Sequence, residues 1–146
     1  MQAESLDNLP GNTTIEHLMI LLGRYFQIRD DYQNLVSSNY TASKGFCEDL
    51  DEGKYSLALI HALQYPGPET LQLRAILQER SRKGAMALEM KKLVREIIER
   101  RRSLEYVHSV LKGMESAVEK EFLRIEEATG ITNYVIRLLF ERLKVE

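Results

Sequence analysis

The amino-acid sequence predicts an all-α protein built as an antiparallel helical array. Three observations support this prediction. The chain has 146 residues and only three prolines, and none follows Pro68, so more than half of it lacks the strongest helix breaker. Apolar residues recur at three- and four-residue spacing over long stretches, which is the period of an amphipathic helix. No stretch shows the sustained apolar–polar alternation that is typical of a half-buried strand.

The first helix is expected over residues 15–37, after a flexible lead of residues 1–14 that ends in turn-forming residues. Either Thr13 or Thr14 is the expected N-cap. The apolar face of this helix is formed by Ile15, Leu18, Met19, Leu22, Phe26 and Leu35. Residues 38–53 contain two glycines and four acids without a sustained period. We therefore expect a loop there, and loops of this length in compact domains are usually functional.

The remainder, residues 54–146, is expected to be helical. Five further segments show helical spacing, which makes six helices in all: 54–64, 69–82, 86–102, 104–129 and 131–144. The run Tyr65-Pro66-Gly67-Pro68 ends one of them, and Thr129-Gly130 is typical of a helix C-terminus. The length suits one domain with its own core.

Composition and charge exclude several classes of function. The chain has 20 Lys+Arg against 22 Asp+Glu, so it lacks the global positive field that attracts nucleic acid. The only cysteine, Cys47, can form neither an internal disulfide nor a zinc site of paired thiolates. No apolar run is long enough to span a bilayer, and the start lacks a signal-peptide pattern. We expect a soluble cytoplasmic protein with no transmembrane segment and no nucleic-acid partner.

The helix over residues 15–37 carries a line of polar side chains at positions i, i+3, i+4 and i+7: Gln27, Asp30, Asp31 and Asn34. These positions share one helix face. One interpretation is an ordinary solvent-facing stripe. The other is a metal site, because adjacent carboxylates repel each other and are best tolerated near a cation. Oxygen ligands with no His or Cys nearby favour Mg²⁺ over a transition metal.

Two lysines, Lys44 and Lys54, bracket the four acids of the expected loop. A lysine ammonium is a flexible point charge suited to a diphosphate. Alternatively, both are surface lysines paired with the loop acids. The three histidines lack a ligand partner at i+3 or i+4, so they are not expected to bind a metal: His17, His61 and His108.

The block FQIRDDYQNL, followed by KGFCEDLDEGKYSLALIHAL, closely resembles the second aspartate-rich region of trans-isoprenyl diphosphate synthases. The geranylgeranyl diphosphate synthases of fungi and animals are the most similar type. The resemblance covers residues 21–63 and continues more loosely through ERSRK and SLEYV. It implies the C-terminal part of an isoprenoid synthase fold. It also implies a prenyltransferase of isoprenoid and terpene biosynthesis, which condenses an allylic diphosphate with isopentenyl diphosphate by Mg²⁺-assisted ionisation.

The resemblance assigns roles by position. Asp30 matches the aspartate that coordinates the Mg²⁺ bound to the allylic diphosphate, with Asp31 as the adjacent metal ligand. Gln27 matches a glutamine beside the substrate, and Lys44 and Lys54 match two lysines that contact the diphosphate. The expected catalytic residues are therefore Asp30, Lys44 and Lys54. Asn34 stands where many members have a third aspartate, as geranylgeranyl-type members commonly do.

A complete synthase also has a first aspartate-rich motif, basic residues for isopentenyl diphosphate and a Lys-Thr pair, and none of these occurs in the 146 residues. We therefore expect activity only together with an N-terminal half, in a homo- or hetero-oligomer. One alternative is a non-catalytic truncated subunit that regulates or scaffolds a full-length synthase. Another is a piece of the prenyltransferase domain of a fungal fusion terpene synthase.

Overall fold

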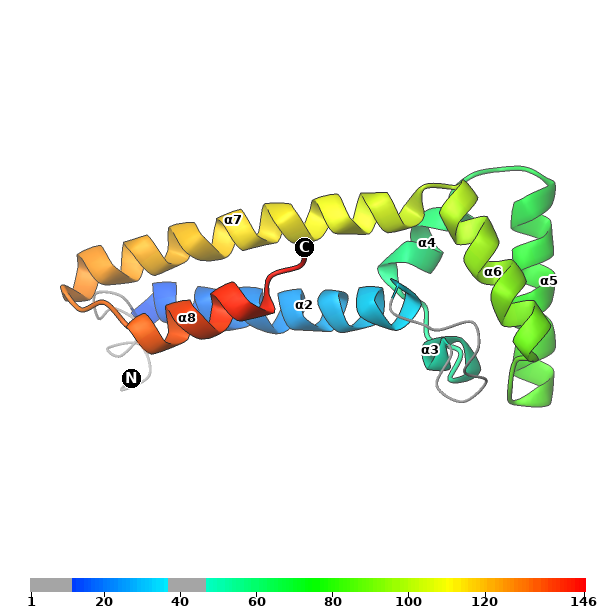
Figure 1. Ribbon diagram of the computed structural model, residues 1–146, viewed down its shortest axis with the longest axis horizontal. Helices are drawn as coiled ribbons and strands as arrows, with labels where there is room; N and C mark the ends of the chain where they lie inside the picture. Colours follow the sequence, from blue (N-terminus) through cyan, green and yellow to red (C-terminus); the bar gives the residue numbers. More distant parts are fainter. Residues whose placement is uncertain (1–11, 37–46) are drawn as a thin grey trace, which may run out of the picture. The chain divides into compact units, whose positions relative to one another are not determined.

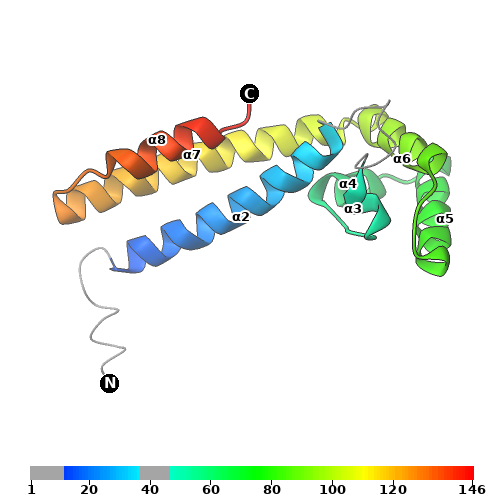
Figure 2. The ribbon, with the colours of Figure 1, turned by 60° about the horizontal axis from the view of Figure 1, so that its bottom comes forward.

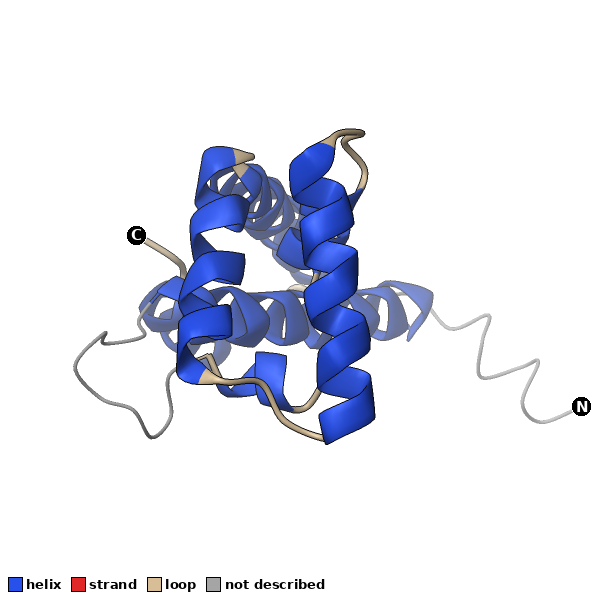
Figure 3. Cartoon of the chain, turned by 90° about the vertical axis from the view of Figure 1, so that its right-hand side faces the viewer, coloured by secondary structure: helices blue, strands red, loops and turns tan. Residues whose placement is uncertain are grey.

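The structure, a computed structural model, describes residues 12–36 and 47–146. Within these residues it contains helices and short connections and no strand (Figures 1 and 3), so the all-α prediction is confirmed there. The helices are α2 (Asn12–Val36), α3 (Glu48–Asp51), α4 (Leu57–Leu63), α5 (Pro68–Lys83), α6 (Leu88–Arg100), α7 (Ser103–Thr129) and α8 (Tyr134–Leu143). None of the helices in this described part is both long and apolar enough to cross a membrane.

The helix boundaries differ from the prediction by up to three residues at several ends; α4, for example, begins at Leu57 instead of residue 54, and α8 begins at Tyr134 instead of residue 131. Helix α2 begins at Asn12, before the two threonines expected to cap it. The expected loop over residues 38–53 contains the one-turn helix α3, so seven helices are described instead of six. At the start of α3, Cys47 adopts a left-handed conformation with φ 47°. Lys44 lies outside the described residues.

The chain divides into two compact units. Unit 1 comprises residues 1–27 and 110–146, and unit 2 comprises residues 28–109. Helices α2 and α7 each contribute one part to unit 1 and the other part to unit 2. All the acids of the expected loop, and both Asp30 and Asp31, belong to unit 2.

Unit 1 is held together by packed aromatic rings and by the hydrogen bonds of a buried carboxylate, Glu115. Helix α8 lies beside α7 (Figure 2), and the Phe140 ring packs edge-on against Tyr25 and Phe122, with centroids 5.5 and 5.9 Å away. The Tyr25 hydroxyl donates a 2.7 Å hydrogen bond to Glu115, and the Val145 N–H donates another of 2.9 Å to the same oxygen. Glu115 thus ties α2 and the residue after α8 to α7.

Unit 2 packs α4, α5 and α6 against the end of α2 and the start of α7. Its fully buried side chains include Leu35, Leu59, Leu73, Val94, Ile97, Ile98 and Val107. The Ser56 hydroxyl caps α4 by accepting the Leu59 N–H at 3.3 Å. Helices α5 and α6 lie side by side and antiparallel (Figure 3), joined by a turn that begins at Gly84 with φ 81°. Unit 2 therefore has a core of its own beneath the predicted site.

Candidate functional site

The predicted site residues occupy different surroundings. Asp30, Asp31 and Asn34 lie in the last two turns of α2, within unit 2, and Lys54 follows α3 in the same unit. Gln27 is exposed and belongs to the unit 1 part of α2. The structure brings Asp31 and Asn34 together with the segment that ends at Lys54, and it leaves Asp30 at the surface.

Asp30 faces solvent. Its side chain is 71% exposed, and its Oδ1 lies 3.5 Å from Nη1 of Arg29. A pair of this kind at an exposed site contributes about 0–1 kcal/mol to stability, so the neighbour does not lock the carboxylate. Asp30 can accordingly meet a hydrated cation that arrives from solution.

Asp31, the next residue, is turned inward. Its side chain is only 12% exposed, and its Oδ1 lies 2.5 Å from Nζ of Lys54. The hydrogen bond to Asp31 raises the pKa of Lys54 above its ordinary value, with Asp49 and Glu52 adding to the effect. Lys54 is therefore cationic at neutral pH. Lys54 is thus paired with an acid of α2 and not with one of the loop acids expected as its partners, and its expected contact with a diphosphate stays a prediction.

A second contact joins α2 to the same segment. The Asn34 side-chain oxygen accepts a 3.2 Å hydrogen bond from the backbone N–H of Asp49, in the first turn of α3. Burial raises the pKa of Asp49; Lys54 lowers it, while Asp31, Glu52 and Glu48 raise it further, and the net result is a raised pKa. The region around Lys54 is thus crowded with negative charge.

Three residues beyond α4 hold this segment from the other side, and sequence reasoning assigned none of them to the site. Arg80 Nε donates a 2.8 Å hydrogen bond to the backbone oxygen of Asp51, and the Asp51 carboxylate accepts the Met86 N–H at 3.1 Å. Lys91 forms an ion pair with that same carboxylate. The one available signal was that Arg80 lies within the ERSRK block that resembles the family.

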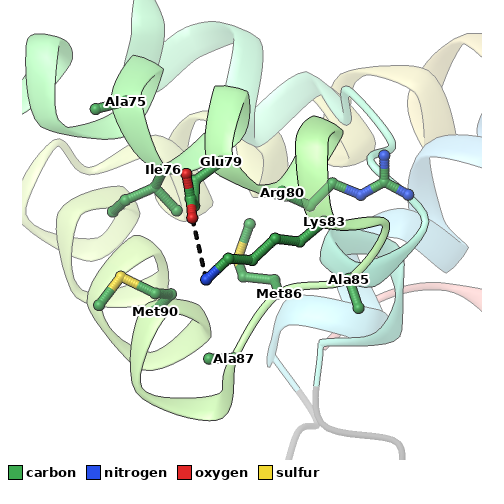
Figure 4. Close-up of a pocket in the computed structure, with 9 residues that line it drawn as sticks. All are labelled: Ala75, Ile76, Glu79, Arg80, Lys83, Ala85, Met86, Ala87 and Met90. Atoms are coloured by element: carbon green, nitrogen blue, oxygen red, sulfur yellow. Dashed lines mark ion pairs between the residues drawn. The ribbon is translucent and has the colours of Figure 1, made fainter.

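A small pocket lies between α5 and α6 (Figure 4). Its volume is about 240 Å³, and it is lined mainly by Ala75, Ile76, Ala85, Met86, Ala87 and Met90. The charges at its rim are matched, because Glu79 and Lys83 form a 3.0 Å ion pair across it. The Arg80 guanidinium points away from the pocket. The pocket thus lacks a convergent set of polar groups, which favours the end of α2 as the candidate site.

The donor set at the end of α2 suits a magnesium ion shared with a ligand. Among the residues that the structure describes, no group of three or more His, Cys, Asp or Glu side chains could hold a metal. Mg²⁺ is commonly bound through one or two carboxylates together with substrate phosphates, and it keeps several waters. An exposed carboxylate at Asp30 with the Lys54 ammonium on the same unit fits that mode of binding and does not fit an all-protein cage.

The geometry is thus that of a helical protein in which Asp31 and Asn34 of α2 contact the segment that ends at Lys54, with Asp30 exposed beside them. The sequence profile of the polyprenyl synthetase family matches residues 3–97, which is more than half of the chain. The chain belongs to this family, which agrees with the resemblance to trans-isoprenyl diphosphate synthases.

Three curated fungal proteins illustrate the relationship. Macrophomene synthase from Macrophomina phaseolina is 49% identical over 88% of the chain and 18% of its own length. A bifunctional sesterterpene synthase from Talaromyces wortmannii is 48% identical over 90% of the chain and 17% of its length. An ophiobolin F synthase from Aspergillus clavatus is 44% identical over 99% of the chain and 21% of its length. The chain spans about a fifth of the length of these relatives.

Proposed function

We propose that the chain supplies the diphosphate-binding part of a prenyltransferase, which joins an allylic diphosphate to isopentenyl diphosphate. The observation that carries the proposal is that two adjacent aspartates at the end of α2 have different environments. Asp30 is open to solvent, while Asp31 is buried against the Lys54 ammonium. A carboxylate for a metal and a fixed cation on one unit are what a metal-bound diphosphate requires. Membership of the polyprenyl synthetase family supports the proposal.

In this proposal, each group acts on the leaving diphosphate. Asp30 would hold Mg²⁺, and Lys44 and Lys54 would contact the diphosphate directly. Gln27 lies beside the substrate. A bound Mg²⁺ would offset the negative charge that develops on the diphosphate when its bond to the allylic carbon breaks. The Lys54 ammonium is placed in advance for the same charge, which is the condition for effective electrostatic catalysis.

The first aspartate-rich motif and the basic residues for isopentenyl diphosphate would come from an N-terminal half, in the same or a second chain. The preferred product is geranylgeranyl diphosphate, on the resemblance of the KGFCEDL block. A second candidate is that the chain is part of a longer fungal protein that joins a prenyltransferase to a terpene cyclase. The description of one relative as a bifunctional sesterterpene synthase favours it. The non-catalytic subunit has no such observation in its favour.

The test is prenyl transfer by the chain co-expressed with a segment carrying the first aspartate-rich motif. We expect Mg²⁺-dependent transfer from an allylic diphosphate, with chromatography of the dephosphorylated products separating geranylgeraniol from longer chains. Asp30→Ala should abolish transfer. The matched control is Glu89→Ala, because Glu89 is also an exposed acid, 79% accessible, paired with a nearby cation. A complex that assembles but shows no transfer would contradict the proposal and favour the non-catalytic subunit.

A further inference from the structure

Two polar contacts join the end of α2 to the segment that carries Lys54. Asn34 accepts the Asp49 N–H at 3.2 Å, and Asp31 is bound to the Lys54 ammonium at 2.5 Å. We call these four residues the α2 clasp. Asp31 and Asn34 are three positions apart, so they lie on the same side of the helix. The two contacts together hold both the beginning and the end of the segment over residues 49–54.

Asp30 and Asp31 are adjacent, but their environments differ sharply. The Asp30 side chain is 71% exposed, whereas that of Asp31 is 12% exposed and has one oxygen bound to Lys54. Mg²⁺ gives up its water shell reluctantly, so it binds an exposed carboxylate more readily than a buried carboxylate that is already paired with an ammonium. A free lysine side chain, by contrast, loses rotamer entropy when it is ordered. A contact that orders Lys54 beforehand removes that cost from ligand binding.

We infer that Asp31 is a positioning residue that holds the Lys54 ammonium ready for a diphosphate and does not coordinate the metal itself, while Asn34 anchors the segment that leads to Lys54. The inference rests on the proposed function and deepens it. It gives the two neighbouring aspartates different roles: Asp30 would bind the metal, and Asp31 positions Lys54.

The identity of residue 34 agrees with this division. Its amide oxygen accepts the Asp49 N–H in a region that already holds the carboxylates of Asp31, Glu48, Asp49 and Glu52. An aspartate here could accept the same hydrogen bond but would add another negative charge, and like charges in such proximity repel. A neutral acceptor is therefore the better anchor. Asn34 thereby gains a role as an anchor that does not require it to bind metal.

The far side of the segment is fixed independently. Arg80 holds the Asp51 backbone oxygen, and Lys91 and the Met86 N–H hold the Asp51 carboxylate. These contacts come from α5, α6 and the turn between them. Removal of the clasp should therefore loosen Lys54 and leave the core of unit 2 folded, which makes the inference testable by substitution.

The binding test uses the full chain, inorganic diphosphate and Mg²⁺ in calorimetric titrations. Asp31→Asn and Lys54→Met should each weaken diphosphate binding by about tenfold, the equivalent of about 1.4 kcal/mol. The double variant should bind no worse than Lys54→Met alone, because both changes remove one interaction. The Mg²⁺ concentration for half-maximal binding should stay unchanged in Asp31→Asn and rise in Asp30→Asn. Lys54→Arg, which keeps the ion pair, should retain most of the binding.

Two results would overturn the inference. One is an Mg²⁺ requirement in Asp31→Asn that rises as much as in Asp30→Asn. The other is an effect of Asp31→Asn that adds fully to that of Lys54→Met.

Hydrogen exchange separates the clasp from the proposed function. Asn34→Ala should speed exchange of the Asp49 amide by about tenfold, and Asn34→Asp should restore most of the protection, since an acceptor returns. Unchanged exchange in Asn34→Ala would refute the anchor, whether or not diphosphate binds. Conversely, Asn34→Ala could change the exchange as expected while the wild-type chain binds no diphosphate. That result would refute the proposed function and the role given to Lys54.

Discussion

Units 1 and 2 differ in the kinds of side chains that they present at the surface. In unit 2, the acids around α3 are matched by cations of the same unit, as Asp31 is by Lys54 and Asp51 by Lys91. In unit 1, large apolar side chains stand in solvent along α8 and its approach: Ile131, Tyr134, Val135, Leu138 and Leu139, with exposures between 54% and 77%. Unit 1 also pairs charges, as in Arg137 with Glu126, but it concentrates exposed apolar side chains along α8, a feature associated with interaction surfaces.

The largest effect is expected at the one carboxylate on which the unit 1 core depends. Glu115→Leu should lower the free energy of unfolding by about 3 kcal/mol, because it removes the buried carboxylate that accepts from the Val145 N–H and from the Tyr25 hydroxyl, which also contacts the Leu143 oxygen at 3.3 Å. Glu115→Gln keeps an acceptor and should cost less than half as much. Urea unfolding followed by far-UV circular dichroism measures both. Equal losses in the two variants would show that the hydrogen bonds are not what holds unit 1 together.

In unit 2, the next largest effect is expected at Gly53. This residue has φ +71°, and an added Cβ would lie 2.7 Å from Nη1 of Arg80. Gly53→Ala should therefore cost about 2 kcal/mol, from backbone strain and from displacement of Arg80. Gly84→Ala is the matched control, since Gly84 has φ +81° with nothing within 4 Å, and it should cost about 1 kcal/mol. If thermal unfolding shows the same loss of stability in both variants, displacement of Arg80 does not contribute to the cost of Gly53→Ala.

The next effect in size is the dependence of the stability on pH, which should differ between the two units. Burial would raise the pKa of Glu115, but hydrogen bonds from Tyr25, Val145 and Lys112 lower it overall. A carboxyl with a lowered folded-state pKa contributes stability above its unfolded pKa, and this contribution is lost as the pH falls through the folded value. Acid should therefore destabilise the contacts of Glu115. Asp49, whose pKa burial raises, has the opposite sign and gains relative stability in acid. Unfolding of Glu115→Gln between pH 6 and pH 3 should show a reduced acid loss; an unchanged slope would exclude Glu115 as its source.

The smallest effect on stability is expected on the exposed face of unit 1. Val135→Gln combined with Leu139→Gln should change the free energy of unfolding by less than about 0.5 kcal/mol, because both side chains are more than half exposed. The same variant should bind less of an apolar fluorescent dye. A large loss of stability would show that these residues belong to the core.

The sequence was sufficient for what depends on local spacing. The period of Leu18, Phe26 and Leu35 located α2, and the Pro-Gly-Pro run located the break before α5. It was insufficient where contacts join distant residues. The Asp31–Lys54 pair spans 23 positions and the Lys91–Asp51 pair spans 40, so no helical or strand period could indicate either. The resemblance named Asp31 and Lys54 separately, but their contact with each other is visible only in the folded chain.

The one-turn helix α3 was missed for a related reason. A four-residue helix offers too few positions for an apolar period, and propensity alone does not stabilise so short a helix. Its stability comes from the Asn34 oxygen on α2 and from the burial of Leu50, which is 3% exposed. Both of these are tertiary interactions. No sequence pattern marks the division into two units, because α2 and α7 run through both units without a break in their helical pattern.

The most direct test of the account is a calorimetric titration of inorganic diphosphate into the wild-type chain and into Asp30→Asn, each with and without Mg²⁺. The account predicts binding to the wild type that is strengthened at least about tenfold by Mg²⁺, a gain of about 1.4 kcal/mol that Asp30→Asn loses. Binding without Mg²⁺ should be equal in the two proteins, because Lys54 and its partner Asp31 are unchanged. Two results would contradict the account: a diphosphate affinity of the wild type that is the same with and without Mg²⁺, or a gain in affinity from Mg²⁺ that is also found in Asp30→Asn.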